Sequence, residues 1–171
     1  MKKSIVRSVI YLITVFSLTN CGVKKATDPT PEVGSASANF NGTAWKSEYA
    51  GALTGGSGST QLLTVVIQLT EKDNSEFVSI GVSPFTGTGT FNYGGSNKIV
   101  FNLKYKGKNY SAVQIGGNAG TGTIKITEFV DSKGILNPGK VVGEFSGTIK
   151  STTSTEILTI TNGKFTAIKV L

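Results

Sequence analysis

Hydrophobic and polar residues alternate along most of the chain after residue 35. In Lys98–Tyr105 every second side chain is apolar or aromatic, beginning with Ile99, while Lys98, Asn102 and Lys104 fall on the other side. A period of two residues predicts a β-strand with one face in the core. The same pattern predicts ten strands, over residues 36–40, 43–46, 61–69, 76–82, 98–105, 110–115, 121–130, 141–150, 156–161 and 164–170.

Turn signals separate these segments. Asn41-Gly42 and Asn162-Gly163 each predict a type I′ hairpin, because both central residues of that turn need a positive φ angle. In residues 141–150, Phe145 lies on an apolar face with glycines, and the opposite face is polar. No segment has a convincing helical period. We therefore expect one antiparallel β-sandwich, or a flattened barrel, over residues 36–171.

The first twenty residues follow a different pattern. Residues 1–7 carry three positive charges, and residues 8–18 form an uninterrupted run of mostly apolar side chains. As a helix this run would span about 16 Å, roughly half the ~30 Å hydrocarbon core of a bilayer. A charged start followed by a short apolar run is typical of a secretory signal peptide rather than a membrane span.

The apolar run ends at Leu18-Thr19-Asn20-Cys21-Gly22, which resembles the lipobox of bacterial lipoproteins. The resemblance implies diacylglycerol on the Cys21 thiol, cleavage of residues 1–20, and frequent acylation of the new N-terminus. Two or three acyl chains would hold the protein durably on a membrane. The alternative is a chance cysteine after an ordinary signal peptide.

The stretch after this cysteine predicts a tether. Residues 21–35 have no hydrophobic period and contain Pro29, Pro31 and Gly34, as expected of an extended linker. No acidic residue follows Cys21 directly. By resemblance to other lipoproteins, this favours the outer membrane, where we expect the periplasmic face, with the cell surface as the alternative.

The amino-acid composition limits the kinds of catalysis, metal binding and partner that the chain can have. The chain has no histidine, which excludes histidine catalysis and histidine metal ligands, and Cys21 is its only cysteine, which excludes disulfides within the chain. Loss of Lys2, Lys3 and Arg7 with the leader would lower the net charge from +7 to +4. That charge is too small to indicate a nucleic-acid partner.

Part of the strand region resembles a family of small Bacteroidetes-type lipoproteins of unknown function. The resemblance is carried by NGTAW at residues 41–45, GTIKIT at 122–127, VGEFSGT at 142–148 and ITNGKF at 160–165, over about half of the domain. It implies an antiparallel β-sandwich and supplies no activity.

The positions of the carboxylates in the sequence do not indicate an active site. A glycosidase needs two of them flanking a bond. Because Glu128, Asp131, Glu144 and Glu156 fall in turns or on polar strand faces, we expect that no two share a buried cleft. Residues 73–76 have oxygen donors but lack the order of a calcium loop, so a tight turn is expected. We predict no enzyme activity, no metal site and no cofactor apart from the lipid on Cys21.

One basic and aromatic patch could bind a ligand. The patch consists of Lys98, Lys104, Lys106 and Lys108 with Tyr105 and Tyr110. Exposed rings beside ammonium groups could hold a sugar or an acidic glycan. The alternative is a hairpin whose lysines protect an edge strand from pairing. Trp45 could likewise be a sugar platform, but a core anchor is expected.

These observations predict a lipid-anchored protein of the cell envelope that binds a ligand or has a structural role. Its expected partners are the membrane and, beyond it, a glycan or an envelope protein. A carbohydrate-binding accessory protein that uses the tyrosines and lysines of the patch is the alternative.

Overall fold

The computed structural model describes residues 34–93, 98–114, 117–118 and 120–169. The leader, Cys21 and nearly all of the predicted tether lie outside these residues. The described chain is all-β, as predicted, with one 3₁₀ turn at Gly58–Thr60. Its strands are β1 (Ser35–Phe40), β2 (Thr43–Ser47), β3 (Tyr49–Gly55), β4 (Leu62–Gln68), β5 (Phe77–Ser83), β6 (Gly89–Asn92), β7 (Lys98–Tyr105), β8 (Lys108–Ser111), β9 (Val113–Gln114), β10 (Gly117–Asn118), β11 (Gly120–Val130), β12 (Gly139–Ser151) and β13 (Ile157–Lys169).

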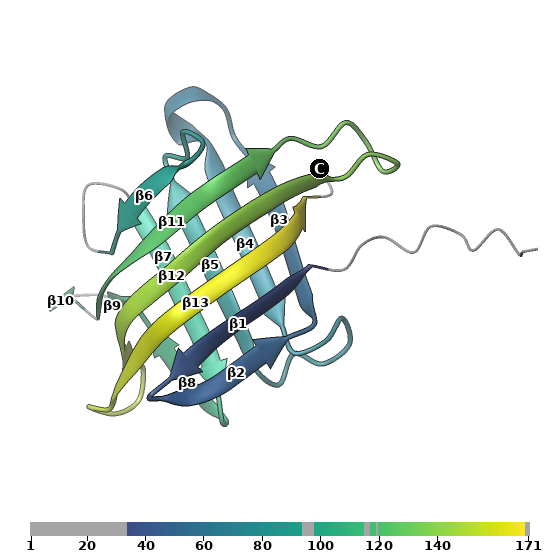
Figure 1. The fold of residues 1–171 in the computed structure, drawn as a ribbon. Helices are drawn as coiled ribbons and strands as arrows, with labels where there is room; N and C mark the ends of the chain where they lie inside the picture. Colours follow the sequence, from purple (N-terminus) through teal and green to yellow (C-terminus); the bar gives the residue numbers. More distant parts are fainter. Residues whose placement is uncertain (1–33, 94–97, 115–116, 119, 170–171) are drawn as a thin grey trace, which may run out of the picture. The chain divides into compact units, whose positions relative to one another are not determined.

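The strands form two facing layers, shown in Figure 1. One layer has the order β6-β11-β12-β13-β1-β2, and the other has the order β3-β4-β5-β7-β8. Two corners join them. At one corner Lys150 of β12 pairs with Ser111 of β8, and at the other Ile168 of β13 runs parallel to Gly51 of β3. The predicted antiparallel sandwich, or flattened barrel, is therefore confirmed, with one parallel contact at a corner.

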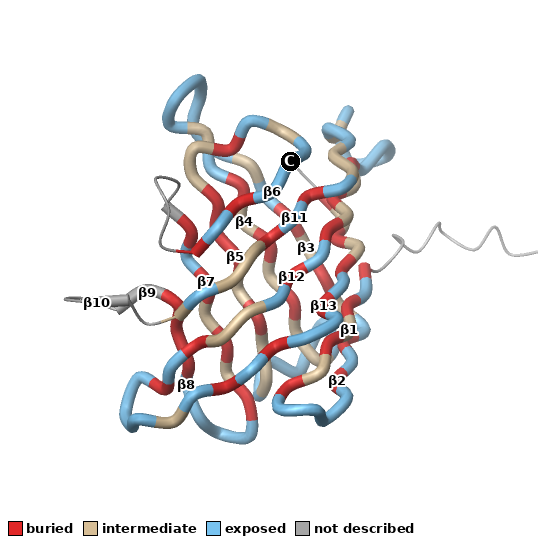
Figure 2. The backbone as a smooth tube through the Cα atoms, turned by 60° about the vertical axis from the view of Figure 1, so that its left-hand side comes forward, coloured by how far each residue is buried: buried red, intermediate tan, exposed pale blue. Residues whose placement is uncertain are grey.

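The core lies between the layers. In β12, Val141, Phe145 and Ile149 are buried, whereas Glu144 and Ser146 are exposed. Figure 2 shows this alternation of buried and exposed positions along the strands of both layers. Because successive side chains of a strand point to opposite faces, each layer has one apolar and one polar side.

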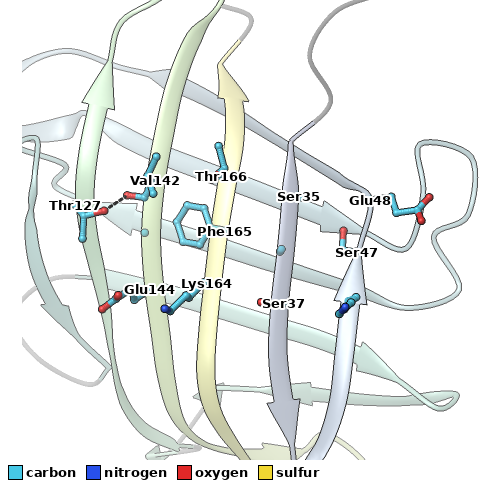
Figure 3. Close-up of a pocket in the computed structure, with 13 residues that line it drawn as sticks. Ser35, Ser37, Ser47, Glu48, Thr127, Val142, Glu144, Lys164, Phe165 and Thr166 are labelled. Carbon is cyan, nitrogen blue, oxygen red and sulfur yellow. Dashed lines mark hydrogen bonds between the residues drawn. The ribbon is translucent and has the colours of Figure 1, made fainter.

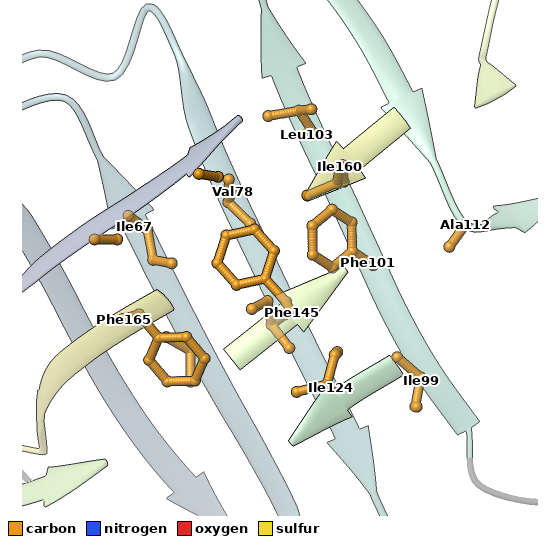
Figure 4. Close-up of a cluster of buried hydrophobic side chains, with 14 of the residues drawn as sticks. Ile67, Val78, Ile99, Phe101, Leu103, Ala112, Ile124, Phe145, Ile160 and Phe165 are labelled. Atoms are coloured by element: carbon orange, nitrogen blue, oxygen red, sulfur yellow. The ribbon is translucent and has the colours of Figure 1, made fainter. Parts of the chain in front are cut away.

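Aromatic rings connect the two layers at the centre of this core. Phe101 of β7 lies 5.7 Å from Phe145 of β12, measured between ring centroids, and Phe145 lies 6.3 Å from Phe165 of β13. Figure 4 shows these rings surrounded by aliphatic side chains of both layers. Trp45 is also buried, 5.1 Å from Phe40, so the expectation of a core anchor is confirmed.

Two hairpins have the turn that their sequences specify. Asn41 and Gly42 have φ angles of 48° and 79°, as the predicted type I′ turn requires. Lys106 and Gly107, at 49° and 74°, form a second two-residue turn of this kind. As a result β8 begins at Lys108, two residues earlier than predicted.

The predicted hairpin at Asn162-Gly163 is wrong. Residues 157–169 form the single strand β13, in which Asn162 alone has a positive φ, of 54°. Phe145 pairs with Gly163 and Gly147 with Ile160, so β13 carries an extra residue there, which is a β-bulge. The neighbouring strands β12 and β1 pair with β13 on both sides of the bulge, and this long-range pairing overrides the local turn preference.

The strands β3 and β6 were not predicted. Their sequences, YAGALTG and GTFN, are rich in small residues and too weakly alternating to stand out. Ala50 and Ala52 of β3 are nevertheless buried, because β3 pairs with β4 along its whole length. Tertiary pairing rather than side-chain pattern makes this segment a strand.

Candidate functional site

Four of the six residues of the predicted basic and aromatic patch meet in one hollow. Tyr105 and Lys106 end β7 and enter its turn, while Lys108 and Tyr110 return in β8. The hollow has a volume of about 250 Å³ and lies at the end of the sandwich that carries this turn. We call it the Tyr105–Tyr110 pocket. Its remaining lining residues are Phe40, Asn41, Thr43, Glu156 and Leu158.

Glu156, just before β13, organises the polar side of the pocket. Its Oε1 accepts a hydrogen bond of 3.0 Å from the Tyr110 hydroxyl, and its Oε2 lies 2.6 Å from Lys108 Nζ. The hydrogen bonds from Lys108 and Tyr110 hold the pKa of Glu156 below its usual range. Burial of the phenol, reinforced by the Glu156 carboxylate, raises the pKa of Tyr110 to about 12. The carboxylate therefore stays charged and the phenol stays protonated at neutral pH.

The structure corrects the expectation that the two rings are exposed. Tyr105 is 8% exposed and Tyr110 is 3% exposed, because both occupy inward-facing positions of their strands. The Tyr105 ring packs 5.0 Å from Phe40, and Lys106 Nζ lies 5.0 Å from the Tyr105 centroid. No ring face is free to stack on a sugar. A ligand here would be bound by the ammonium, carboxylate and amide groups around the pocket.

The other lysines of the predicted patch do not line this pocket. Lys104 alternates with Tyr105 along β7 and lies between Phe77 and Asn109 of the neighbouring strands. The side chain of Lys98 lies outside the described residues. The pocket therefore contains the turn of the β7–β8 hairpin but not the outer face of β7.

Glu76 forms hydrogen bonds to residues next to the pocket. In the sequence it was considered only as one of the oxygen donors of residues 73–76. Its Oε2 accepts 2.9 Å from Trp45 Nε1, and its Oε1 accepts 3.0 Å from the backbone N–H of Lys106. Just before it, the Ser75 N–H donates 2.9 Å to Asp73 Oδ1, but the backbone hydrogen bonds that close the turn join Thr70 and Asp73, so the tight turn lies three residues earlier than expected. Thirty residues separate Glu76 from Lys106, so no local sequence signal identifies this contact.

The other three carboxylates considered for catalysis lie apart. Glu128 pairs with Lys140 at 2.9 Å, and Asp131 pairs with Lys169 at 2.6 Å, which keeps the pKa of Asp131 low. Glu144 is exposed on the polar face of β12. None of these three side chains, nor Glu156, is buried, so no two share a buried cleft, as predicted. The described residues contain no cluster of three or more metal-ligating side chains.

The polar face of the β11-β12-β13-β1-β2 layer is hollowed by two grooves. The first, shown in Figure 3, has a volume of about 450 Å³ and is lined by short polar side chains such as Ser37, Thr127 and Thr166. The second, of about 430 Å³, lies beside it, and Glu144 and Lys164 line both. Glu144 and Lys164 are directly opposite each other in the register of β12 and β13, which is the arrangement of a solvated sheet surface.

No helix of the described residues is long and apolar enough to cross a membrane.

Comparisons of the chain with protein-family models, with curated proteins and with solved structures find no match. The lipobox and the Bacteroidetes-type motifs therefore stay predictions from the sequence. The function has to be argued from the residues and their geometry.

Proposed function

We propose that the protein is a lipoprotein of the bacterial envelope, anchored to the outer membrane through Cys21, whose β-sandwich is a binding module. The observation that carries the proposal is the order of the parts along the chain. A lipobox ends at Cys21, and the first strand of the packed domain begins fourteen residues later, at Ser35. A short linker of this kind separates a membrane anchor from a domain that folds in water.

The chemistry of the domain favours binding over catalysis. The chain has no histidine, and lipidation would consume its one thiol. Glu128, Asp131 and Glu156 each form an ion pair with a different lysine. A general acid or base needs a free group with a shifted pKa in a shielded site. Exposed carboxylates that are neutralised by lysines do not suit this role.

The test of the anchor is the variant Cys21→Ser. Metabolic labelling with an alkyne-bearing fatty acid should mark the wild-type chain and leave the variant unlabelled, because the thiol is the acceptor. Thr19→Ser, which keeps a small polar residue two positions before Cys21, is the matched control and should be labelled normally. Undiminished labelling of Cys21→Ser would contradict the proposal.

A second candidate function is recognition of a small acidic or polyhydroxylated ligand, such as a glycan, in the Tyr105–Tyr110 pocket. It is favoured by the convergence of Lys106, Lys108, Glu156 and Asn41 on one hollow. Ammonium and carboxylate groups can bind both hydroxyl and acidic groups of a sugar.

Its test is a glycan-array and envelope pull-down screen with the full chain carrying Cys21→Ser. Changing Lys106 and Lys108 together to alanine should remove the captured ligand. Lys104→Ala is the matched control, because this lysine lies on the same hairpin outside the pocket and its loss should leave binding unchanged. Equal binding by both variants would reject the pocket as the site.

A further inference from the structure

The loop between β11 and β12 presents two large aliphatic side chains to solvent. The N–H of Asn137 donates 3.0 Å to the carbonyl of Gly134, which places Ile135 and Leu136 at the two corner positions of a β-turn. Their exposed fractions are 82% and 89%. Turn corners are usually occupied by glycine, proline, asparagine, aspartate or serine. Neither local turn chemistry nor core packing explains these two residues.

This loop, residues 131–138, has a defined hydrogen-bonded form. Lys133 N–H donates 3.0 Å to the carbonyl of Asn137, and Gly134 N–H donates 3.2 Å to Ser132 Oγ. At its base, Asp131 pairs with Lys169 of β13 at 2.6 Å. The turn therefore holds the two aliphatic side chains at the tip of the hairpin.

The loop lies at the end of the sandwich where the predicted tether enters. Ser35, the first residue of β1, is beside Thr166 of β13, and Gly139, which follows the loop, is beside Lys169. Three residues of β13 separate these levels, or about 10 Å. Figure 1 shows the loop and the start of β1 on the same side of the molecule. The chain from Cys21 to Gly34 spans at most about 45 Å when fully extended, so this end lies within about 45 Å of a membrane that holds Cys21.

The charges around the tip suit the surface of an anionic membrane. Lys133 is exposed in the loop, whereas Lys140 and Lys169 are ion-paired with Glu128 and Asp131, so the charged groups around the tip sum to +1. Lysines beside an apolar tip can keep their ammonium groups at the lipid headgroups while the apolar side chains enter the acyl region. Val130, the last residue of β11, adds a half-exposed aliphatic side chain beside the loop.

We propose that Ile135 and Leu136 insert into the surface of the bilayer that holds Cys21, so that the β11–β12 loop is a second membrane contact. This inference rests on the proposed lipid anchor and adds an orientation to it. Twelve residues of β13 separate Lys169 from Ile157, which is about 40 Å along the strand. The Tyr105–Tyr110 pocket, at the Ile157 end, would then face away from the membrane.

The test uses the full lipidated protein in vesicles of phosphatidylethanolamine and phosphatidylglycerol. An environment-sensitive fluorophore is attached to the variant Leu136→Cys, in which the lipid blocks Cys21 and leaves one reactive thiol. The matched control is Ile157→Cys, because Ile157 is an aliphatic residue 52% exposed at the other end of β13. Emission at position 136 should shift to the blue, and brominated lipids should quench it several-fold more than at position 157. Equal quenching at both positions would overturn the inference.

A second measurement separates this inference from the lipid anchor. The chain that begins at Gly22 has neither the leader nor the lipid, so any binding to the same vesicles must come from residues 22–171. Changing Ile135 and Leu136 together to serine should lower its partition into the vesicles roughly ten-fold.

If fatty-acid labelling of Cys21 succeeds but neither vesicle assay responds, the loop inference fails and the anchor stands. If labelling fails while the serine variant still loses vesicle binding, the anchor is rejected and the apolar tip retains its membrane contact. A blue shift at position 136 that depends on the protein concentration, and occurs without lipid, would indicate self-association. It would also overturn the inference.

Discussion

The two ends of the sandwich differ in which of their large apolar and charged side chains are buried. At the end with the Tyr105–Tyr110 pocket, Gly107 provides one of the two positive φ angles of the β7–β8 turn, and the neighbouring rings point into the core. At the other end, Ile135 and Leu136 point into solvent while the side chain of Lys169 is 3% exposed. The first end is explained by folding. The second is explained only if something outside the chain covers its tip.

The buried lysine shows that the second end is nevertheless well formed. The stem of Lys169 lies at an inward-facing position of β13, and its ammonium group reaches Asp131, whose side chain is 74% exposed. A long side chain can bury its methylenes and keep its charge near water in this way. The exposure of Ile135 and Leu136 is therefore not the result of a poorly packed end.

The largest expected effect tests whether the two ends belong to one folding unit. Phe145→Ala should destabilise the domain by about 3–5 kcal/mol, because it removes a ring that touches Phe101 and Phe165 at the centre of the core. Urea unfolding should be followed by Trp45 fluorescence near the pocket and by a probe at position 136. Coincident transitions are expected. Separate transitions would mean that the ends unfold independently, and Ser146→Ala, on the exposed face, is the control.

The second-largest effect on stability is expected at the β-bulge of β13, the strand that runs between the two ends. A Cβ atom added at Gly163 would collide with the backbone oxygen of Phe145 and lie 2.6 Å from its ring. Gly163→Ala should therefore cost about 1–3 kcal/mol through overpacking. Gly55→Ala, at a strand end with no neighbour within 4 Å, should change stability by less than about 0.5 kcal/mol. Equal unfolding midpoints for the two variants would show that the bulge tolerates a side chain.

An alkaline pH effect is expected at the pocket end. Because the pKa of Tyr110 is raised to about 12 in the folded protein, its contribution to stability is complete below the usual tyrosine value near 10. It is lost as the pH rises from about 10 through 12. Glu156→Ala should lower this pKa, since it removes a hydrogen-bond acceptor and a negative charge, while burial keeps it above the usual value. Tyrosinate absorbance, compared with Tyr110→Phe, measures the shift, and an unchanged midpoint would refute the role of Glu156.

The smallest effect on stability is expected at the other end. The double variant Ile135→Ser and Leu136→Ser should unfold within about 0.5 kcal/mol of the wild type, because both side chains are almost fully exposed. Thermal and urea unfolding of the soluble chain measure this directly. A loss of more than about 1 kcal/mol would mean that the tip packs on the domain, and the contrast between the two ends would disappear.

The candidate site was predictable only in part. The hairpin pattern brought Tyr105, Lys106, Lys108 and Tyr110 together, as expected for residues that flank a two-residue turn. The burial of Tyr105 followed from the alternation along β7, but the burial of Tyr110 and the contribution of Glu156 were not predictable. They depend on β13, whose first strand residue follows Glu156, more than forty residues further along the chain. Strand alternation gives the face of each side chain but not what covers that face.

The sequence by itself determined the all-β class, the apolar face of β7 and β12, and the Asn41-Gly42 turn, because these depend on periodicity and local backbone preferences. The signal peptide and the lipidation of Cys21 remain predictions from the sequence. Only the tertiary structure decided that β3 is a strand and that Asn162-Gly163 is a bulge rather than a turn. It also placed Ile135 and Leu136 at the end where β1 begins. These outcomes depend on pairing between distant segments, whose energy exceeds the local preferences that a sequence displays.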